Sequence, residues 1–177
     1  VKELILITPS LILPSLFVIL AISYLGGAIL ARNLDENMII KMLKLIDERL
    51  LLGQEVAFWV PLILPVVLMI VILLLNQWQN AKGFILIVAA LKGVFFGIGS
   101  SFLLTKKLQL VAYTIWWFPF QLVLSLLFLI FAVKLAPPFF MKRTGKLDKN
   151  NRPLILILIL ILLLTIIESN IYPFMIK

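Results

Sequence analysis

Five stretches of about 20 apolar residues constrain the fold more than any other feature of the sequence. They cover about residues 11–31, 56–75, 83–104, 110–136 and 154–172. An α-helix needs about 20 residues to cross the roughly 30 Å hydrocarbon core of a membrane. Apolar residues make up 63% of the chain and charged residues 14%, which excludes an ordinary soluble domain and a disordered chain. The sequence therefore predicts an all-α, multi-pass membrane bundle with about five transmembrane helices, forming a single domain over residues 1–177.

The fifth stretch alternates leucine and isoleucine from Leu154 to Ile161, which is also a strand-like pattern. An open apolar strand in lipid leaves backbone groups without hydrogen bonds, whereas a helix satisfies them within itself. A membrane barrel would alternate apolar with polar side chains, and this segment does not. We therefore predict a helix here.

The connection from Arg32 to Glu55 predicts an amphipathic helix over about residues 35–52, lying at the membrane surface with Asp35 as its cap. Its apolar residues recur at helical spacing, and charged residues occupy much of the other face. The apolar set is Met38, Ile39, Met42, Leu43, Ile46 and Leu50, and the charged set is Lys41, Lys44, Asp47, Glu48 and Arg49. The helix either packs against its own bundle or docks a partner domain, and the sequence leaves both open.

The connection over residues 137–153 is strongly basic. It holds Lys142, Arg143, Lys146, Lys149 and Arg152 against a single acid, Asp148. Short basic loops stay in the cytoplasm. The other Lys and Arg residues do not decide the orientation, so the density of charge in this loop does. We predict a cytoplasmic N-terminus, an extracytoplasmic C-terminus and a docking surface for a partner on the loop.

Several classes of chemistry are missing from the sequence. The chain has no Cys and no His, which removes thiol catalysis, the commonest general base and the commonest metal ligands. It contains no phosphate-binding loop and no pair of nucleophile and base. The net charge of +8 is typical of residues that flank lipid headgroups, and it forms no stripe for nucleic acid. We predict a chain that is not an enzyme and needs no cofactor or metal.

Two ionisable residues lie inside predicted membrane helices, where charge is costly and often functional. These are Lys92 in the third helix and Glu168 in the fifth. The two helices run in the same direction, and their rise places the residues roughly 8–9 Å apart along the membrane normal. A structural ion pair or a lysine that reaches toward the surface is one interpretation, and a functional polar path is the other.

Small residues mark two helix faces. Gly26 and Gly27 lie on the first helix, and Gly93, Gly97 and Gly99 lie on the third. Small residues one turn apart let two helix backbones touch. Such contact occurs either within one bundle or between copies of the chain.

The segment Trp116–Gln121 is the most unusual in the chain. Pro119 removes a helix hydrogen bond and predicts a kink, which frees a carbonyl for Gln121 to bond. Trp116 and Trp117 predict either an interfacial aromatic belt or a substrate-facing groove.

Four segments together resemble the stage II sporulation protein M family of small bacterial membrane proteins with five helices. Tyr24–Leu34 looks like the family's glycine-containing end of the first helix, and Leu91–Gly93 with Gly97 looks like its Lys-Gly step. Phe118–Gln121 resembles its Pro-Gln-Asn segment, and Ile167–Pro173 resembles its Glu-x-x-x-x-Pro terminus.

The resemblance implies a bacterial cell membrane and one of two settings. In circular bacteriocin clusters, similar proteins are thought to work with an ATPase and a larger membrane protein in the maturation or export of a hydrophobic peptide, or in immunity to it. In endospore formers, such a protein anchors peptidoglycan hydrolases during engulfment. The first setting is the one we expect for this chain.

Overall fold

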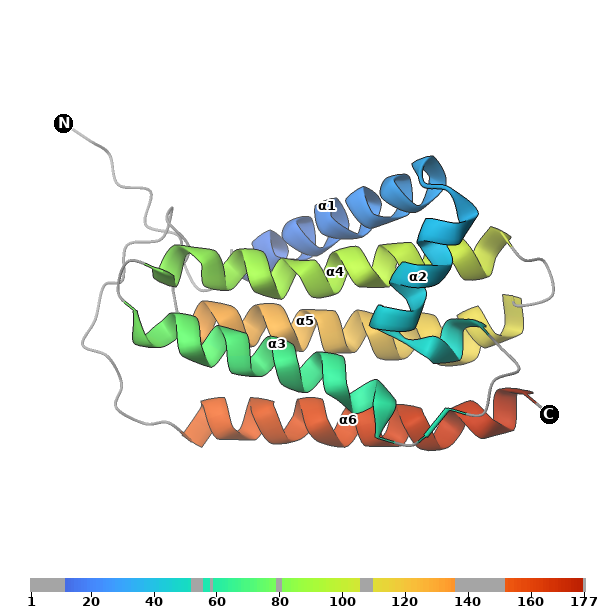
Figure 1. Cartoon of the computed structure of the whole chain (residues 1–177). Coiled ribbons are helices and arrows are strands. Elements are labelled where there is room, and N and C mark those ends of the chain that lie inside the picture. The colour runs from blue at the N-terminus through green and yellow to red at the C-terminus, as the bar shows by residue number, and fades with distance from the viewer. Residues whose placement is uncertain are drawn as a thin grey trace.

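The computed structural model describes residues 12–51, 56–57, 59–78, 81–105, 110–135 and 152–176. Every element in this part of the chain is a helix (Figure 1). In chain order these are α1 (Ile12–Asn33), α2 (Glu36–Ile46), the 3₁₀-helix η2 (Glu48–Leu51), α3 (Val60–Gln77), α4 (Lys82–Thr105), the π-helix η5 (Ala112–Trp117), α5 (Phe118–Leu135) and α6 (Arg152–Ile176).

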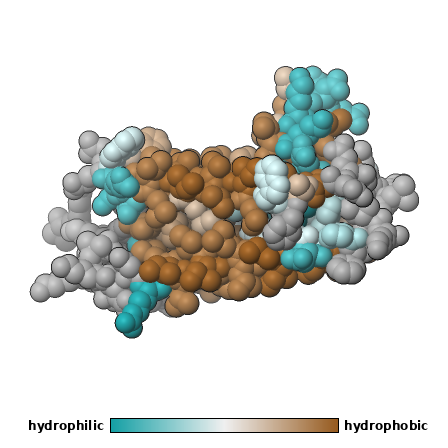
Figure 2. All heavy atoms as spheres, turned by 60° about the horizontal axis from the view of Figure 1, so that its bottom comes forward, coloured by the Kyte–Doolittle hydropathy of each residue, from teal (hydrophilic) through white to brown (hydrophobic). Residues whose placement is uncertain are grey.

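In the part of the chain that the structure describes, five segments are long and apolar enough to cross a membrane, which confirms the predicted all-α bundle. They are Leu13–Asn33, Val60–Gln77, Lys82–Thr105, Ala112–Leu135 and Arg152–Pro173. In Figure 1, α1, α4 and α6 run in one direction, and α3 and α5 run in the other. Figure 2 shows an apolar band across the middle of the face in view, with hydrophilic residues gathered toward its two ends.

Helix α4 is central because it packs against α1, α3 and α5. Its contact with α1 depends on glycines. A Cβ atom added at Gly27 would meet the backbone carbonyl of Val94, and one added at Gly97 would meet the backbone carbonyl of Tyr24. A Cβ at Gly93 would meet the side chain of Ser23. The structure thus places Gly27 and Gly97 against the backbone of the facing helix, and Gly93 against a side chain, inside one chain. A Cβ atom added at Gly26 would meet no described atom within 4 Å, so Gly26 does not take part in this contact.

The predicted amphipathic helix over residues 35–52 is shorter than expected. Helix α2 ends at Ile46, and Asp47 adopts an extended backbone before η2 begins. This break turns the chain toward the bundle. Asp47 and Arg49, which we predicted on the outer polar face, are therefore buried. Lys41 and Lys44 are exposed as expected.

The irregularity predicted at Pro119 takes the form of the π-helix η5. Proline has no N–H to donate, and its ring would clash with the carbonyl of Ile115 in a regular helix. The helix widens instead, and the N–H of Phe118 donates to the carbonyl of Tyr113. Such π-type turns commonly occur as single insertions within α-helices.

The prediction of an interfacial belt at Trp116 and Trp117 is wrong, because both side chains are buried inside the bundle. The tryptophans exposed at helix ends are Trp59 and Trp78, which flank α3. At about 1.5 Å per residue they lie about 28 Å apart along the helix. This spacing matches the thickness of the hydrocarbon core, so these two residues suit the two membrane interfaces.

Candidate functional site

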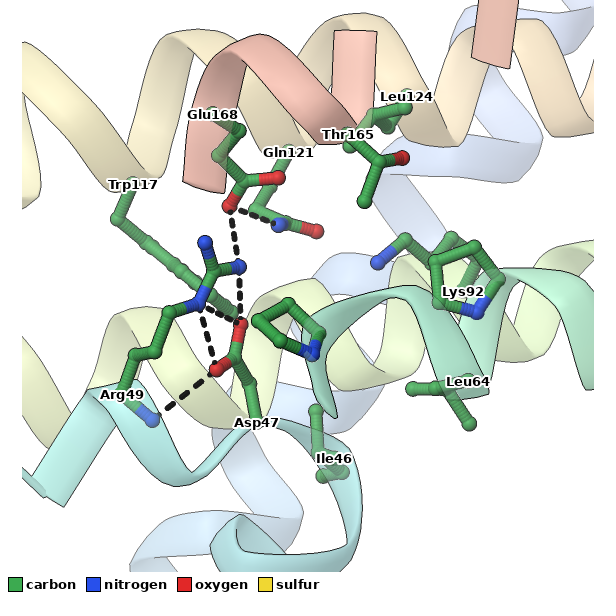
Figure 3. Close-up of a pocket in the computed structure, with 12 residues that line it drawn as sticks. Ile46, Asp47, Arg49, Leu64, Lys92, Trp117, Gln121, Leu124, Thr165 and Glu168 are labelled. Carbon is green, nitrogen blue, oxygen red and sulfur yellow. Dashed lines mark hydrogen bonds and ion pairs between the residues drawn. The ribbon is translucent and has the colours of Figure 1, made fainter. Parts of the chain in front are cut away.

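A buried polar cluster lies where η2 meets the membrane helices (Figure 3). Asp47 and Arg49 come from the turn after α2, Lys92 from α4, Gln121 from α5 and Glu168 from α6. All five side chains are nearly inaccessible, with Arg49 exposed by 2% and Lys92 by 4%. The cluster therefore joins four separate parts of the chain at one place.

Arg49 is the hub of the cluster. Its Nε donates to Asp47 Oδ1 at 2.9 Å and to Oδ2 at 3.0 Å, and its Nη2 donates to Asp47 Oδ2 at 2.6 Å. The same Nη2 donates to Glu168 Oε1 at 3.0 Å. A planar guanidinium can bind two carboxylates at once in this way, whereas a lysine ammonium cannot reproduce the fork.

Aromatic rings and the backbone complete the setting of Arg49. Its guanidinium carbon lies 5.0 Å from the centroid of the Trp116 ring and 5.7 Å from that of Tyr172. The Tyr172 hydroxyl donates to the backbone carbonyl of Arg49 at 3.2 Å. These contacts hold η2 against η5 and α6.

The charge of Arg49 is stable in this environment. Burial alone would lower the pKa of the guanidinium, because a low dielectric disfavours charge. The carboxylates of Asp47 and Glu168 outweigh this effect and raise the pKa of Arg49 above its usual value. Arg49 therefore remains a cation at every pH that the folded protein meets.

Gln121 and Lys92 approach the cluster differently. Gln121 Nε2 donates to Glu168 Oε1 at 2.9 Å. The sequence had predicted that this amide would bond a carbonyl freed near Pro119, and its partner in the structure is Glu168 instead. Lys92 lines the same cavity and interacts electrostatically with Glu168. Among the described residues, the ion pairs of this cluster join Arg49 to Asp47 and to Glu168, and none joins Lys92 to Glu168.

A small cavity of about 10 Å³ opens between these side chains. It is lined by polar groups of Lys92, Gln121, Thr165 and Glu168, and by apolar groups that include Trp117 and Leu124. This volume is about that of one water molecule. Trp117 contributes to the lining of this cavity, whereas Trp116 does not, and the substrate-facing groove stays a prediction.

The other predicted site residues lie apart from the cluster. Gly99 packs against the Trp117 ring. Arg152 begins α6 and is exposed. Lys142, Arg143, Lys146 and Lys149 lie outside the described residues. Among the described residues, no group of three or more Asp or Glu side chains is placed to hold a metal ion.

Sequence reasoning missed Asp47 and Arg49 as members of the site. The sequence holds one signal of their burial, which is their apolar neighbours. Asp47 follows Ile46, and Arg49 precedes Leu50 and Leu51. A helix of unbroken periodicity would still have placed them outward.

Replacing Tyr172 with phenylalanine should cause a small loss of stability. The substitution removes the hydroxyl that donates to the carbonyl of Arg49 and leaves the ring in place. A lost hydrogen bond of this kind costs about 1 kcal/mol, so we expect the melting temperature in detergent to fall by about 2–4 °C. An unchanged melting temperature would show that this hydrogen bond does not help to hold η2.

Comparison of the chain with protein-family models, curated proteins and solved structures finds no match. The resemblance to the stage II sporulation protein M family thus stays a prediction that rests on the four sequence segments.

Proposed function

We propose that the chain is a non-catalytic subunit of a membrane assembly. The observation that carries this proposal is the way the buried charges engage one another. Arg49 binds both Asp47 and Glu168, and Gln121 occupies the same oxygen of Glu168 as Arg49 does. These polar groups are ion-paired or hydrogen-bonded to one another, and the cavity beside them has the size of one water molecule. Both features favour a structural role over the binding of a substrate.

The arrangement of the helices supports two separate surfaces for partners. Helix α2 lies toward the end of the bundle where α4 ends, whereas α5 ends and α6 begins at the opposite end (Figure 1). The basic segment over residues 137–153 connects α5 to α6. A membrane around the apolar band would therefore separate α2 from the basic segment.

The partners that we propose follow from the family resemblance and the predicted orientation. A cytoplasmic ATPase would dock on the basic segment, and a larger membrane protein would pack against the lipid-facing helices. The assembly would act on a hydrophobic peptide of the circular bacteriocin type, in maturation, export or self-immunity. Acidic surfaces on an ATPase would complement Lys142, Arg143 and Lys146.

Charge reversal tests this proposal. The triple variant Lys142→Glu, Arg143→Glu, Lys146→Glu should abolish co-purification of the ATPase and reduce peptide export at least tenfold, without changing the melting temperature. The matched control is Lys41→Glu, Lys44→Glu on α2, which reverses two exposed charges at the other end of the bundle. The control should retain the ATPase. Retention of the ATPase by the triple variant would contradict the proposed docking surface.

One observation favours a second candidate, an engulfment scaffold that anchors peptidoglycan hydrolases. Helix α2 exposes Met38 and Leu45, the latter by 80%, beside the charged Lys41 and Lys44. The predicted orientation places this surface outside the cytoplasm, where a hydrolase would bind. A source organism that does not form endospores would eliminate this candidate.

A further inference from the structure

Three buried groups in the cluster have hydrogen-bonding capacity that faces the cavity. Glu168 Oε1 accepts from Arg49 at 3.0 Å and from Gln121 at 2.9 Å, whereas Glu168 Oε2 is buried and has no hydrogen-bond partner among the described residues. The same is true of Gln121 Oε1 within the described part of the chain. The amine of Lys92 approaches from the other side of the cavity (Figure 3). Two acceptors and one strong donor therefore converge on the same small space.

The register of the helices explains why Lys92 does not reach Glu168 directly. Lys92 lies about 15 Å along α4 from Lys82, and Glu168 lies about 24 Å along α6 from Arg152, at about 1.5 Å per residue. The two helices start at the same end of the bundle (Figure 1). Lys92 thus lies about 9 Å nearer that end of the bundle than Glu168 does along the helix axes, and its side chain lines the cavity.

The cavity has the size and the chemistry for one water molecule. Its volume is about 10 Å³, and a buried water needs roughly 10–15 Å³ and two to four polar partners. A water at this position would accept one hydrogen bond from the Lys92 ammonium. It would donate its two protons to Glu168 Oε2 and Gln121 Oε1. Each of the three groups would then have a hydrogen-bond partner at the cavity, as most buried polar groups do.

We propose that this cavity is a specific site for one water molecule, which links Lys92 to Glu168 and Gln121 and so joins four charges into one network. In their ionised forms, Asp47 and Glu168 carry two negative charges, and Arg49 and Lys92 carry two positive charges. The network is therefore neutral as a whole, which is the arrangement that a buried cluster at membrane depth requires. Without Lys92, the other three residues would carry a net charge of −1.

Structure determination of the whole protein tests the water site directly. A cryo-electron microscopy map that resolves ordered waters should show one peak within hydrogen-bond distance of Lys92 Nζ, Glu168 Oε2 and Gln121 Oε1. The site would be disproved if the map showed a direct bond from Lys92 Nζ to Glu168, or no density in the cavity. This measurement needs no variant and no knowledge of the protein's partners.

A double-mutant cycle tests the charge link. Lys92→Met should lower the melting temperature in detergent by on the order of 10 °C, because it leaves an uncompensated carboxylate. Adding Glu168→Gln should restore part of that loss, since Asp47 and Arg49 then balance each other. The control Lys134→Met changes an exposed lysine of α5 and should shift the melting temperature by less than about 2 °C.

The cycle has an outcome that would overturn the link. If the double variant melts at or below the temperature of Lys92→Met, the two charges do not compensate each other. If Lys92→Met fails to fold, expression of the folded double variant shows the same compensation, and its absence counts against the link.

Discussion

Replacing Arg49 with methionine is expected to lower the melting temperature of the detergent-solubilised protein by about 10 °C. The guanidinium bonds two carboxylates, Asp47 and Glu168, and all three side chains are buried. Methionine has a similar length but no charge, so both carboxylates would lose their closest cation. Breaking a buried ion pair in this way costs about 3–5 kcal/mol, and each kcal/mol shifts the melting temperature of a chain of this size by about 2–4 °C.

Two further variants separate charge from geometry at this position. Arg49→Lys keeps the positive charge but loses the planar fork, so we expect a melting temperature between those of wild type and Arg49→Met. Arg32→Met removes an exposed cation at the end of α1 and should have little effect. If Arg49→Met unfolded within about 2 °C of wild type, the cluster would contribute little to the stability of the bundle.

The anchoring of α2 should weaken together with the cluster. Because η2 reaches α6 through Arg49, and Tyr172 donates to the Arg49 carbonyl, Arg49→Met removes part of the attachment between α2 and the bundle. Hydrogen exchange of residues 36–51 should therefore accelerate in Arg49→Met more than exchange within α4, since local opening depends on local contacts.

The five membrane helices were predictable because one physical constraint determines them. Long apolar segments in lipid must satisfy their backbone internally, and helices of about 20 residues do this. The alternation of leucine and isoleucine after Pro153 did not mislead the prediction for the same reason. The bounds of α4 and α6 differ from the predicted ones by a few residues at most, because polar residues and Pro153 flank the apolar runs.

The buried cluster was only half predictable. Lys92, Gln121 and Glu168 stand out because each is a polar residue within an apolar run. Asp47 and Arg49 do not stand out, because they sit among other charges in a segment of helical periodicity. Residues two apart do not face each other on a helix, so their pairing required the break at Asp47. That break is stabilised by Glu168, which is 119 residues away from Arg49 in the sequence.

The tryptophan error has a similar origin. Two adjacent tryptophans near the start of a predicted span suggested the interface, but η5 forms the first part of that span and both rings are buried inside the bundle. There the Gly99 position leaves room for the Trp117 ring, and Trp116 packs against Arg49 and Tyr172. Neither contact can be read from local composition, because each depends on a distant partner.

Gly27→Ala is expected to lower the melting temperature by about 5–10 °C, although it adds only one methyl group. The added Cβ would meet the backbone carbonyl of Val94, and a backbone atom cannot turn aside as a flexible side chain can. Helix α1 must therefore move away from α4, which is its principal contact in the bundle. Overpacking costs about 1–3 kcal/mol and more where the backbone is involved, which gives the expected shift.

The neighbouring glycine provides a matched control for this prediction. A Cβ at Gly26 meets no atom of the described residues within 4 Å, and alanine is favoured over glycine within a helix by up to about 1 kcal/mol. Gly26→Ala should therefore leave the melting temperature unchanged or raise it slightly. A similar loss in both variants would show that the cost arises from the α1 backbone itself and not from its contact with α4.

Combining Gly27→Ala with Gly97→Ala tests how α1 responds. Gly97 faces the backbone of α1 at Tyr24 and Ala28, so each substitution forces the same two helices apart. Once the first methyl has separated them, the second finds part of the space already made. Substitutions at contacting sites are commonly non-additive for this reason. We expect the double variant to lose clearly less stability than the sum of the two single losses. A fully additive result would mean that each clash is relieved locally, without movement of α1 as a unit.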